Sequence, residues 1–128
     1  MFIPHDNRSP GVIVALTNEM AQRLWGRNLS FDQSASQLSA LWVHGYQLPF
    51  NSVCFHPGAA GVDMFRCIGS WRTQINYVFP RRPILVRLFT FLPTTKARAI
   101  VTVNDCQIVS TERVVVVLCC DTRCRWSN

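Results

Sequence analysis

The chain has 128 residues, 48% of them hydrophobic, and its thirteen Lys and Arg against seven Asp and Glu give a net charge of +6. This length and composition predict one globular domain that can bury its own core. No uninterrupted apolar run reaches the roughly 18 residues that a membrane helix needs. The first ten residues lack the basic start and apolar stretch of a secretory signal. We therefore expect an intracellular protein, in cytoplasm or nucleus, without membrane association.

The first forty residues are expected to be partly helical. Thr17 is placed to cap a short helix through NEMAQRLW, which Gly26 would end. Ser30 and Gln33 have the S-x-x-Q spacing of a capping box, which predicts a second helix through SASQLSALW, ending near Gly45. The run GVIVAL before Thr17 fits a strand or a helix, because it is too short for its periodicity to decide.

The remainder of the chain is expected to be β-structure. β-branched and aromatic residues dominate four runs, SVCF (52–55), ILVRLFTFL (84–92), ARAIVTV (97–103) and RVVVVLCC (113–120). Prolines flank the second run, and turn signals recur at intervals of about ten residues, which is typical of a sandwich or barrel. We therefore predict a mainly β fold, with a partly helical N-terminal extension over residues 1–40 and a β domain over residues 41–128.

Six cysteines are expected to be reduced thiols in a reducing compartment, several of them inside apolar runs. A zinc site is the alternative, with Cys54, His56, Cys120 and Cys124 as ligands. The C-x-H and C-x3-C spacings of these residues lack the paired C-x2-C pattern of zinc sites, so the sequence favours buried thiols.

The stretch HPGAAGVDMF places an acid, Asp63, directly after a loop of glycine and alanine. Glycine permits positive φ and alanine is small, so a ligand or another strand can approach this backbone closely. Asp63 is then placed to hold Mg²⁺ through water or to orient a neighbouring backbone group. The alternative, which is the commoner arrangement, is a tight turn whose acid is hydrogen-bonded to its own loop.

The order of segments around this loop resembles the dUTPase superfamily. GAAGVDMF is similar to the family's A-G-Y-D-L motif, and it is followed by YVFP, by ILVRLFTF closed by Leu92 and Pro93, by ARAIVTVND and by RVVVVLCCDT. Upstream, LWVHGYQLPFNSV lies where family members have their first strand. The resemblance covers about residues 41–126 and implies a dUTPase-like β-barrel or jelly-roll sandwich, often assembled as a trimer. It also implies a nucleotide-binding loop remnant and a weak Mg²⁺ site at Asp63, with the remnant formed by Gly58, Ala59, Ala60, Gly61 and Asp63.

The departures from the family pattern argue against catalysis. Val62 replaces the aromatic residue of the first motif, and residues 101–105 read VTVND where the family has the phosphate-binding P-R-S-G motif. The third motif, which supplies the water-activating aspartate, is replaced by the short CQIVSTE, and a fourth motif is missing. Hydrolysis of dUTP needs a phosphate clamp, a metal and a base. Only Asp63 is a candidate for any of these, since Asp105 has no phosphate-binding neighbour.

Three functions follow, in decreasing order of support. Resemblance to catalytically inactive dUTPase-related proteins of adenoviruses and herpesviruses implies a viral accessory protein that binds host proteins, with Trp42 and Trp126 as anchors if they are exposed rather than core residues. The second is residual hydrolysis of dUTP to dUMP and pyrophosphate with Mg²⁺, or nucleotide binding, with Arg66, Arg98 or Arg113 as phosphate contacts. The third is nucleic-acid binding, which scattered Lys and Arg do not favour. No cofactor is expected unless the protein is an enzyme.

Overall fold

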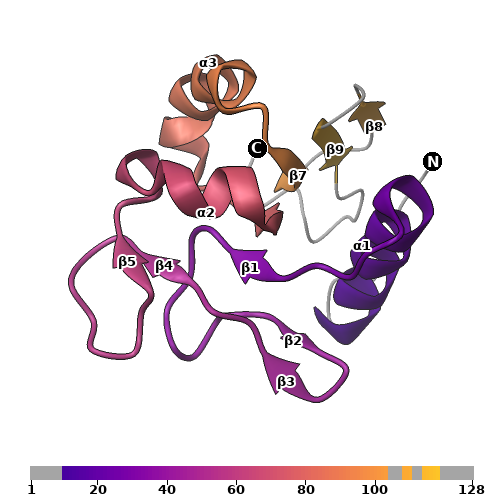
Figure 1. Ribbon diagram of the computed structural model, residues 1–128, viewed down its shortest axis with the longest axis horizontal. Coiled ribbons are helices and arrows are strands. Elements are labelled where there is room, and N and C mark those ends of the chain that lie inside the picture. Colours follow the sequence, from indigo (N-terminus) through magenta and orange to yellow (C-terminus); the bar gives the residue numbers. More distant parts are fainter. Residues whose placement is uncertain (1–9, 104–107, 111–113, 119–128) are drawn as a thin grey trace.

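In the computed structural model, the described residues are 10–103, 108–110 and 114–118, and they form helices and short strands in a mixed α/β arrangement (Figure 1). The helices are α1 (Pro10–Trp25), α2 (Ile68–Thr73) and α3 (Leu85–Thr95), with 3₁₀ turns η1 (Met64–Arg66) and η2 (Arg82–Ile84). The strands are β1 (Phe31–Asp32), β2 (Trp42–Val43), β3 (Tyr46–Gln47), β4 (Asn51–Ser52), β5 (Gly61–Val62), β6 (Ile75–Val78), β7 (Arg98–Val103), β8 (Ile108–Ser110) and β9 (Val114–Leu118).

The main sheet has five strands in the order β1-β6-β7-β9-β8, and β8 is the antiparallel member. On the other side of β1, a parallel bridge joins Asp32 to Phe50, immediately before β4, and β4 pairs with β5 in parallel. The continuous order is therefore β5-β4-β1-β6-β7-β9-β8. The chain runs outward from β1 to β5, then returns across β1 to form β6 on its other side.

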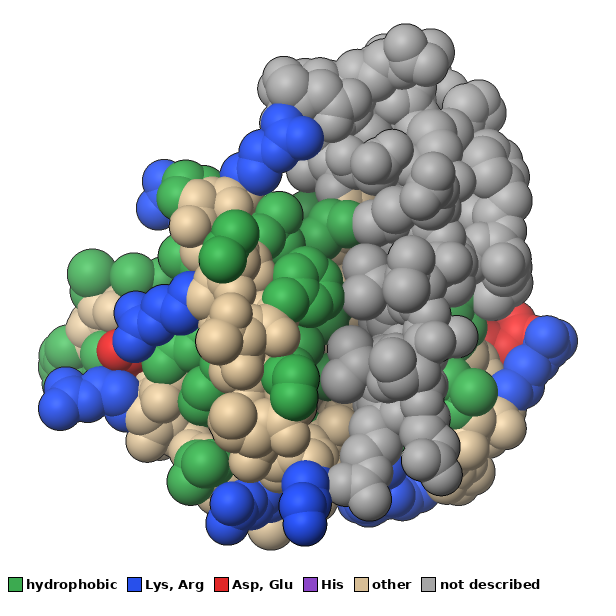
Figure 2. Space-filling view, turned by 90° about the horizontal axis from the view of Figure 1, so that it is seen from above, with side chains coloured by type: hydrophobic (Ala, Val, Ile, Leu, Met, Phe, Trp, Pro, Cys, Tyr) green, Lys and Arg blue, Asp and Glu red, His purple; other side chains and the backbone are tan. Residues whose placement is uncertain are grey.

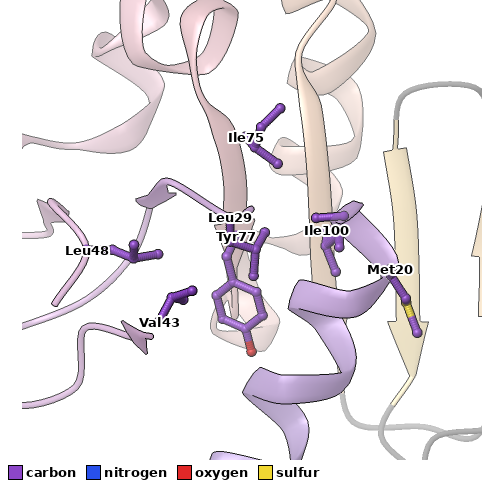
Figure 3. Packing of buried hydrophobic residues seen from close by; sticks show 8 residues of the cluster. Met20, Leu29, Val43, Leu48, Ile75, Tyr77 and Ile100 are labelled. Atoms are coloured by element: carbon purple, nitrogen blue, oxygen red, sulfur yellow. The ribbon is translucent and has the colours of Figure 1, made fainter. Parts of the chain in front are cut away.

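Alternate residues of each strand point to opposite faces of this sheet, so apolar side chains lie on both faces. Helices pack against both of them. On one face, α1 packs through Met20 and Ala21 against a cluster that also contains the strand residues Ile75, Tyr77 and Ile100 (Figure 3). On the other face, α2 and α3 pack against Val78, Ala99 and Val101 through the buried side chains of Trp71, Leu88 and Leu92. The layers are therefore helix, sheet and helix.

Helix α1 contains the helical segment expected over NEMAQRLW, and it ends as expected before Gly26. Gly26 has a φ of 66°, and its N–H donates to the carbonyl of Gln22 at 2.8 Å, which closes the last turn. The open question about GVIVAL is answered in favour of helix, since α1 begins at Pro10. Thr17 is therefore a buried residue inside the helix and not its cap.

The expected second helix over SASQLSALW was wrong, because the residues of the supposed capping box make long-range contacts. Ser30 Oγ accepts the N–H of Ile75 at 2.9 Å and donates to Gln74 Oε1 at 2.7 Å. Gln33 is buried between strands. The segment instead forms turns and then the β2–β3 hairpin, whose two-residue turn has positive φ at His44 and Gly45, as type I′ turns require.

The expected strand over residues 84–92 was also wrong, because these residues form α3. Leu88 and Leu92 are buried four residues apart, and Ile84 and Phe91 pack on the same cluster, which is the spacing of a helix face. Pro83 precedes the helix in η2, where a missing N–H is tolerated. Pro93 lies within the last turn of α3.

The remaining β predictions are confirmed in part. β7 and β9 lie within ARAIVTV and RVVVVLCC, whereas SVCF contributes only Ser52 to β4. The described strands form an open sheet and no closed barrel, so the mainly β class is replaced by a small mixed α/β fold. β1 belongs to the main sheet, so residues before position 40 contribute to it; the division of the chain at residue 40 stays a prediction. None of the described helices has the length and apolar character to span a membrane.

Candidate functional site

The strand order reverses between β1 and β6, and this reversal marks a candidate site. In open parallel sheets, ligands bind outside the carboxyl ends of the strands at the point where the order reverses. β1 and β6 are adjacent and parallel, so the segments that follow them leave the sheet side by side. We call the segments that follow β1, β4, β5 and β6, residues 34–41, 53–56, 63–66 and 79–82, the carboxyl edge.

Asp32 is the last residue of β1 and is 3% exposed. Its Oδ1 accepts the N–H of Ser34 at 3.3 Å, and its Oδ2 accepts the N–H of Leu41 at 3.2 Å. Burial raises the pKa of the Asp32 carboxyl to about 7, and the two N–H groups oppose that shift. The carboxylate therefore ties together both ends of segment 34–41.

Segment 34–41 is held at further points along its length. The N–H of Ala35 donates to the carbonyl of Asn51 at 3.1 Å, and the N–H of Ala40 donates to the carbonyl of Ser36 at 2.9 Å. Gln47 of β3 donates through Nε2 to the carbonyl of Gln37 at 2.7 Å. The segment is thus an ordered turn that joins β1, β4 and the hairpin, and Leu38 at its tip is 98% exposed.

A buried amide network crosses the sheet beneath this edge, on the α2 face. Gln33 Nε2 donates to Asn76 Oδ1 at 2.7 Å and to Ser70 Oγ at 3.0 Å, and Gln33 Oε1 accepts from Asn51 Nδ2 at 2.7 Å. Asn76 Nδ2 lies within 3.0 Å of the carbonyls of Trp71 and of two further residues, Gln74 and Arg98. The network links β4, β1, β6 and α2, so it fixes the strands on both sides of the reversal.

The β6 side of the carboxyl edge is cationic and aromatic. Phe79, which directly follows β6, is 38% exposed, and Arg81 and Arg82 are exposed just before α3. The first turn of α3 has no acid, and the guanidinium of Arg87 lies 4.0 Å from the ring centroid of Phe65. Figure 2 shows hydrophobic side chains in the middle of the described part of this face, with Lys and Arg side chains along its left and lower margins.

Apart from the buried Asp32 at the end of β1, the β1 and β4 side of the edge carries no charged side chain. No Asp, Glu, Lys or Arg occurs between Gln33 and Val62. Large apolar side chains are nevertheless exposed in this stretch, with Trp42 at 61%, Tyr46 at 78% and Phe55 at 81%. The part of the carboxyl edge that follows β1 and β4 is thus uncharged apart from Asp32, whereas the part that follows β6 is cationic.

The glycine-alanine loop closes against the protein's own backbone and side chains. A Cβ on Gly61 would lie 2.8 Å from Asn51 Oδ1 and 2.9 Å from Cys67 Sγ, so the close approach that glycine permits is used here by β4 and Cys67. Asp63 has a φ of 63°, and its Oδ1 accepts the N–H of Phe65 at 3.1 Å as the cap of η1. Of the two alternatives for Asp63, the structure therefore has the acid bonded to its own loop.

The other candidate residues are dispersed. Gly58 donates its N–H to His56 Nδ1 at 2.9 Å, and Ala59 and Ala60 donate theirs to the carbonyls of His56 and Phe50. Arg66 is exposed in η1, three residues after Asp63. Arg98 begins β7 and therefore lies at the amino end of the sheet, away from the edge that Asp63 follows.

The metal sites considered from the sequence stay predictions, since Cys120 and Cys124 lie outside the described residues. Within the described ranges, no three His, Cys, Asp or Glu side chains are grouped to hold a metal ion, and Cys54 is an exposed free thiol. The other residues considered for chemistry or contact lie outside the described residues: Asp105, Arg113, Cys120, Cys124 and Trp126.

Asp32 and Gln33 are the residues of this site that sequence reasoning missed. Gln33 was assigned to a capping box with Ser30, because the S-x-x-Q spacing fits one, and Asp32 lies between these two residues. A signal was available in the sequence. Asp32 and Gln33 directly follow the apolar Phe31 and precede the small residues SAS, and this order also fits the end of a buried strand. Comparison of the chain with models of protein families, with curated proteins and with solved structures found no match.

Proposed function

We propose that the protein binds a nucleotide at the carboxyl edge, between the ends of β1 and β6. The observation that carries this proposal is the reversal of strand order at β1, since this is the place in an open α/β sheet where ligands bind. The nucleotide alternative considered from the sequence is thereby moved from the glycine-alanine loop to the neighbouring strand ends.

The two halves of the edge suit the two parts of a nucleotide. Arg81 and Arg82 supply donors for phosphate beside a helix N-terminus that has no acid in its first turn. Phe79 supplies a partly exposed ring for stacking, and segment 34–41 supplies uncharged backbone and hydroxyl groups for a base or sugar. β1 is followed by a hairpin and not by a glycine-rich turn and helix, so the arrangement does not favour a dinucleotide.

The test is equilibrium binding of ATP, GTP and dUTP to the purified protein, with Arg81→Ala as the variant. Loss of a charge-assisted hydrogen bond to phosphate should weaken binding by about ten-fold or more. Arg72→Ala is the matched control, because Arg72 is an exposed arginine of α2 close to the opposite end of β6. The proposal would be contradicted if the two variants weakened binding equally. It would also be contradicted if none of the three nucleotides bound.

Residual dUTP hydrolysis with Mg²⁺ is tested in the same samples. Turnover of dUTP that is abolished by Asp63→Asn would make the protein an enzyme with Asp63 in its metal site, and it would support the resemblance to dUTPases, which stays a prediction. No turnover and no rise in melting temperature with dUTP would remove this candidate. Nucleotide binding at the carboxyl edge does not depend on this result.

A second candidate function is that of a viral accessory protein that binds a host protein, free of catalysis. The observation that favours it is the exposure of Trp42, since tryptophan is enriched at interface hot spots. Affinity purification from host cells, followed by a Kd measured with the purified partner, is the test. Trp42→Ala should weaken that Kd at least ten-fold, whereas Leu24→Ala, which truncates an exposed side chain of α1, should leave it unchanged. A Kd that Trp42→Ala does not change would remove Trp42 as the anchor.

A further inference from the structure

We infer that Asp32 is a positioning residue for the proposed nucleotide site, holding segment 34–41 in place through its carboxylate and thereby making ligand affinity depend on its ionisation. This inference rests on the proposed function and adds a regulatory residue to it. It also predicts, for the ligand-free protein, that both ends of segment 34–41 change together when the Asp32 carboxyl group ionises.

The geometry supports a common response of the two ends. One carboxylate oxygen accepts from Ser34, two residues after Asp32, and the other accepts from Leu41, nine residues after it. An ionised carboxylate accepts both N–H groups in charge-assisted bonds, whereas a protonated carboxyl group is a weaker acceptor at its hydroxyl oxygen. Ionisation therefore tightens both ends of the segment, and protonation weakens at least one of them.

Among the described residues, no charged side chain is a cause of the shift in the Asp32 pKa. Tyr77 is the titratable residue beside it on β6, at the paired register position. The hairpin contributes His44, whose Nε2 lies 3.4 Å from Asn18 Nδ2 of α1. The described charged residues of α1, Glu19 and Arg23, form an ion pair with each other at exposed positions. The shift in the Asp32 pKa has burial as its largest cause, and the value of about 7 places the change in charge near neutral pH.

The first experiment needs no ligand. The amide NMR resonances of Ser34 and Leu41 are followed from pH 5 to pH 9 together with the Asp32 carboxyl carbon. We expect all three signals to shift with one common midpoint, near neutral pH. Asp32→Asn should remove the shift of both amides, and the control Asp63→Asn should retain it while changing the Phe65 amide. Amide signals that stay flat while the carboxyl carbon titrates would overturn the inference.

The second experiment measures the Kd for ATP at pH 5.5 and pH 8.5 in the wild type and in Asp32→Asn. Because the same ligand is used, titration of its phosphates affects both proteins alike. Between pH 5.5 and pH 8.5, the factor by which the affinity for ATP rises should be about five times larger in the wild type than in the variant. This is the change expected for strengthening one hydrogen bond. Equal gains would overturn the link to affinity. Coupled amide shifts without binding of ATP, or of GTP or dUTP in the same assay, at either pH would instead overturn the proposed function, and with it the claim about affinity.

Discussion

The stability of the protein should fall as the pH rises from about 4 to about 7, because of Asp32. The ordinary pKa of this carboxyl group is 3.8, and burial raises it to about 7 in the folded protein. Between these values the folded state binds a proton that the unfolded state has released, so stability decreases with pH. The contribution is present in full below pH 3.8 and is lost as the pH rises through about 7.

The size of the effect follows from the shift. One pKa unit corresponds to about 1.4 kcal/mol, so a shift of about three units corresponds to roughly 4 kcal/mol. A typical domain has only about 5–15 kcal/mol of stability, so the loss should be easy to measure. Asp32→Asn removes the ionisation but replaces one of two acceptor oxygens by a donor, which costs about 1–3 kcal/mol. The variant should therefore be less stable than the wild type near pH 4.5 and more stable by about 1–3 kcal/mol at pH 8.

Urea denaturation at pH 4.5, 6 and 8 measures these differences. The quantity of interest is the free energy of unfolding of the wild type minus that of Asp32→Asn at each pH, since this difference isolates one carboxyl group from all others. Asp63→Asn is the control with the same change in charge at a partly exposed carboxylate, and it should keep the pH dependence of the wild type. If the wild type and Asp32→Asn lose stability in parallel, the account of Asp32 as a buried, ionisable group is refuted.

Five further substitutions test the packing around the site. Gly61→Ala should destabilise the fold by about 1–3 kcal/mol, because its Cβ would press on Asn51 and Cys67, whereas Gly69→Ala in α2 meets no atom within 4 Å and should be neutral or stabilising. Trp71→Ala should cost about 3–5 kcal/mol and Trp42→Ala under about 0.5 kcal/mol, since the first side chain is fully buried and the second is 61% exposed. Asn76→Leu should cost about 3 kcal/mol, because it leaves Gln33 and buried carbonyls without their donor or acceptor. Thermal and urea denaturation measure each change, and a Trp42→Ala loss as large as that of Trp71→Ala would show that this side of the edge is packed.

The parts of the fold that local chemistry decides were predictable from the sequence. Gly26 ends α1 because a positive φ closes a helix there, and this requirement is visible in one residue. Four of the six residues at 98–103 are apolar, and the strand is buried on both faces, as such a run predicts. Residues 84–92 were misassigned because flanking prolines and aromatic side chains fit a strand, while the four-residue spacing of Leu88 and Leu92 fits a helix. Here the tertiary contact with Val78 and Ala99 decides the structure, and a single sequence does not show it.

The site could be predicted less well, because its residues are defined by partners far away in the chain. Gln33 contacts Asn76, 43 residues later, and Ser30 contacts Gln74, 44 residues later. Without the strand pairing, both residues fit a helix cap equally well. The sequence predicted a close approach of a ligand or strand to the glycine-alanine loop, and at Gly61 the approaching groups are Asn51 of β4 and Cys67. The sequence pattern thus indicated where other atoms approach the backbone closely, but it did not indicate which residues supply those atoms.

The shortness of β1 and β4 explains why polar side chains are buried at the strand reversal. Each of these strands has two residues, so the backbone ladder alone provides few hydrogen bonds across the centre of the sheet. The side-chain amides of Gln33, Asn51 and Asn76 add bonds in the same lateral direction, and each is at most 1% exposed. On the α2 face the polar groups at this edge are therefore committed to the fold, whereas Asp32 on the opposite face binds a surface turn. A ligand at the strand reversal would accordingly change the turn through Asp32 before it could disturb the amide network.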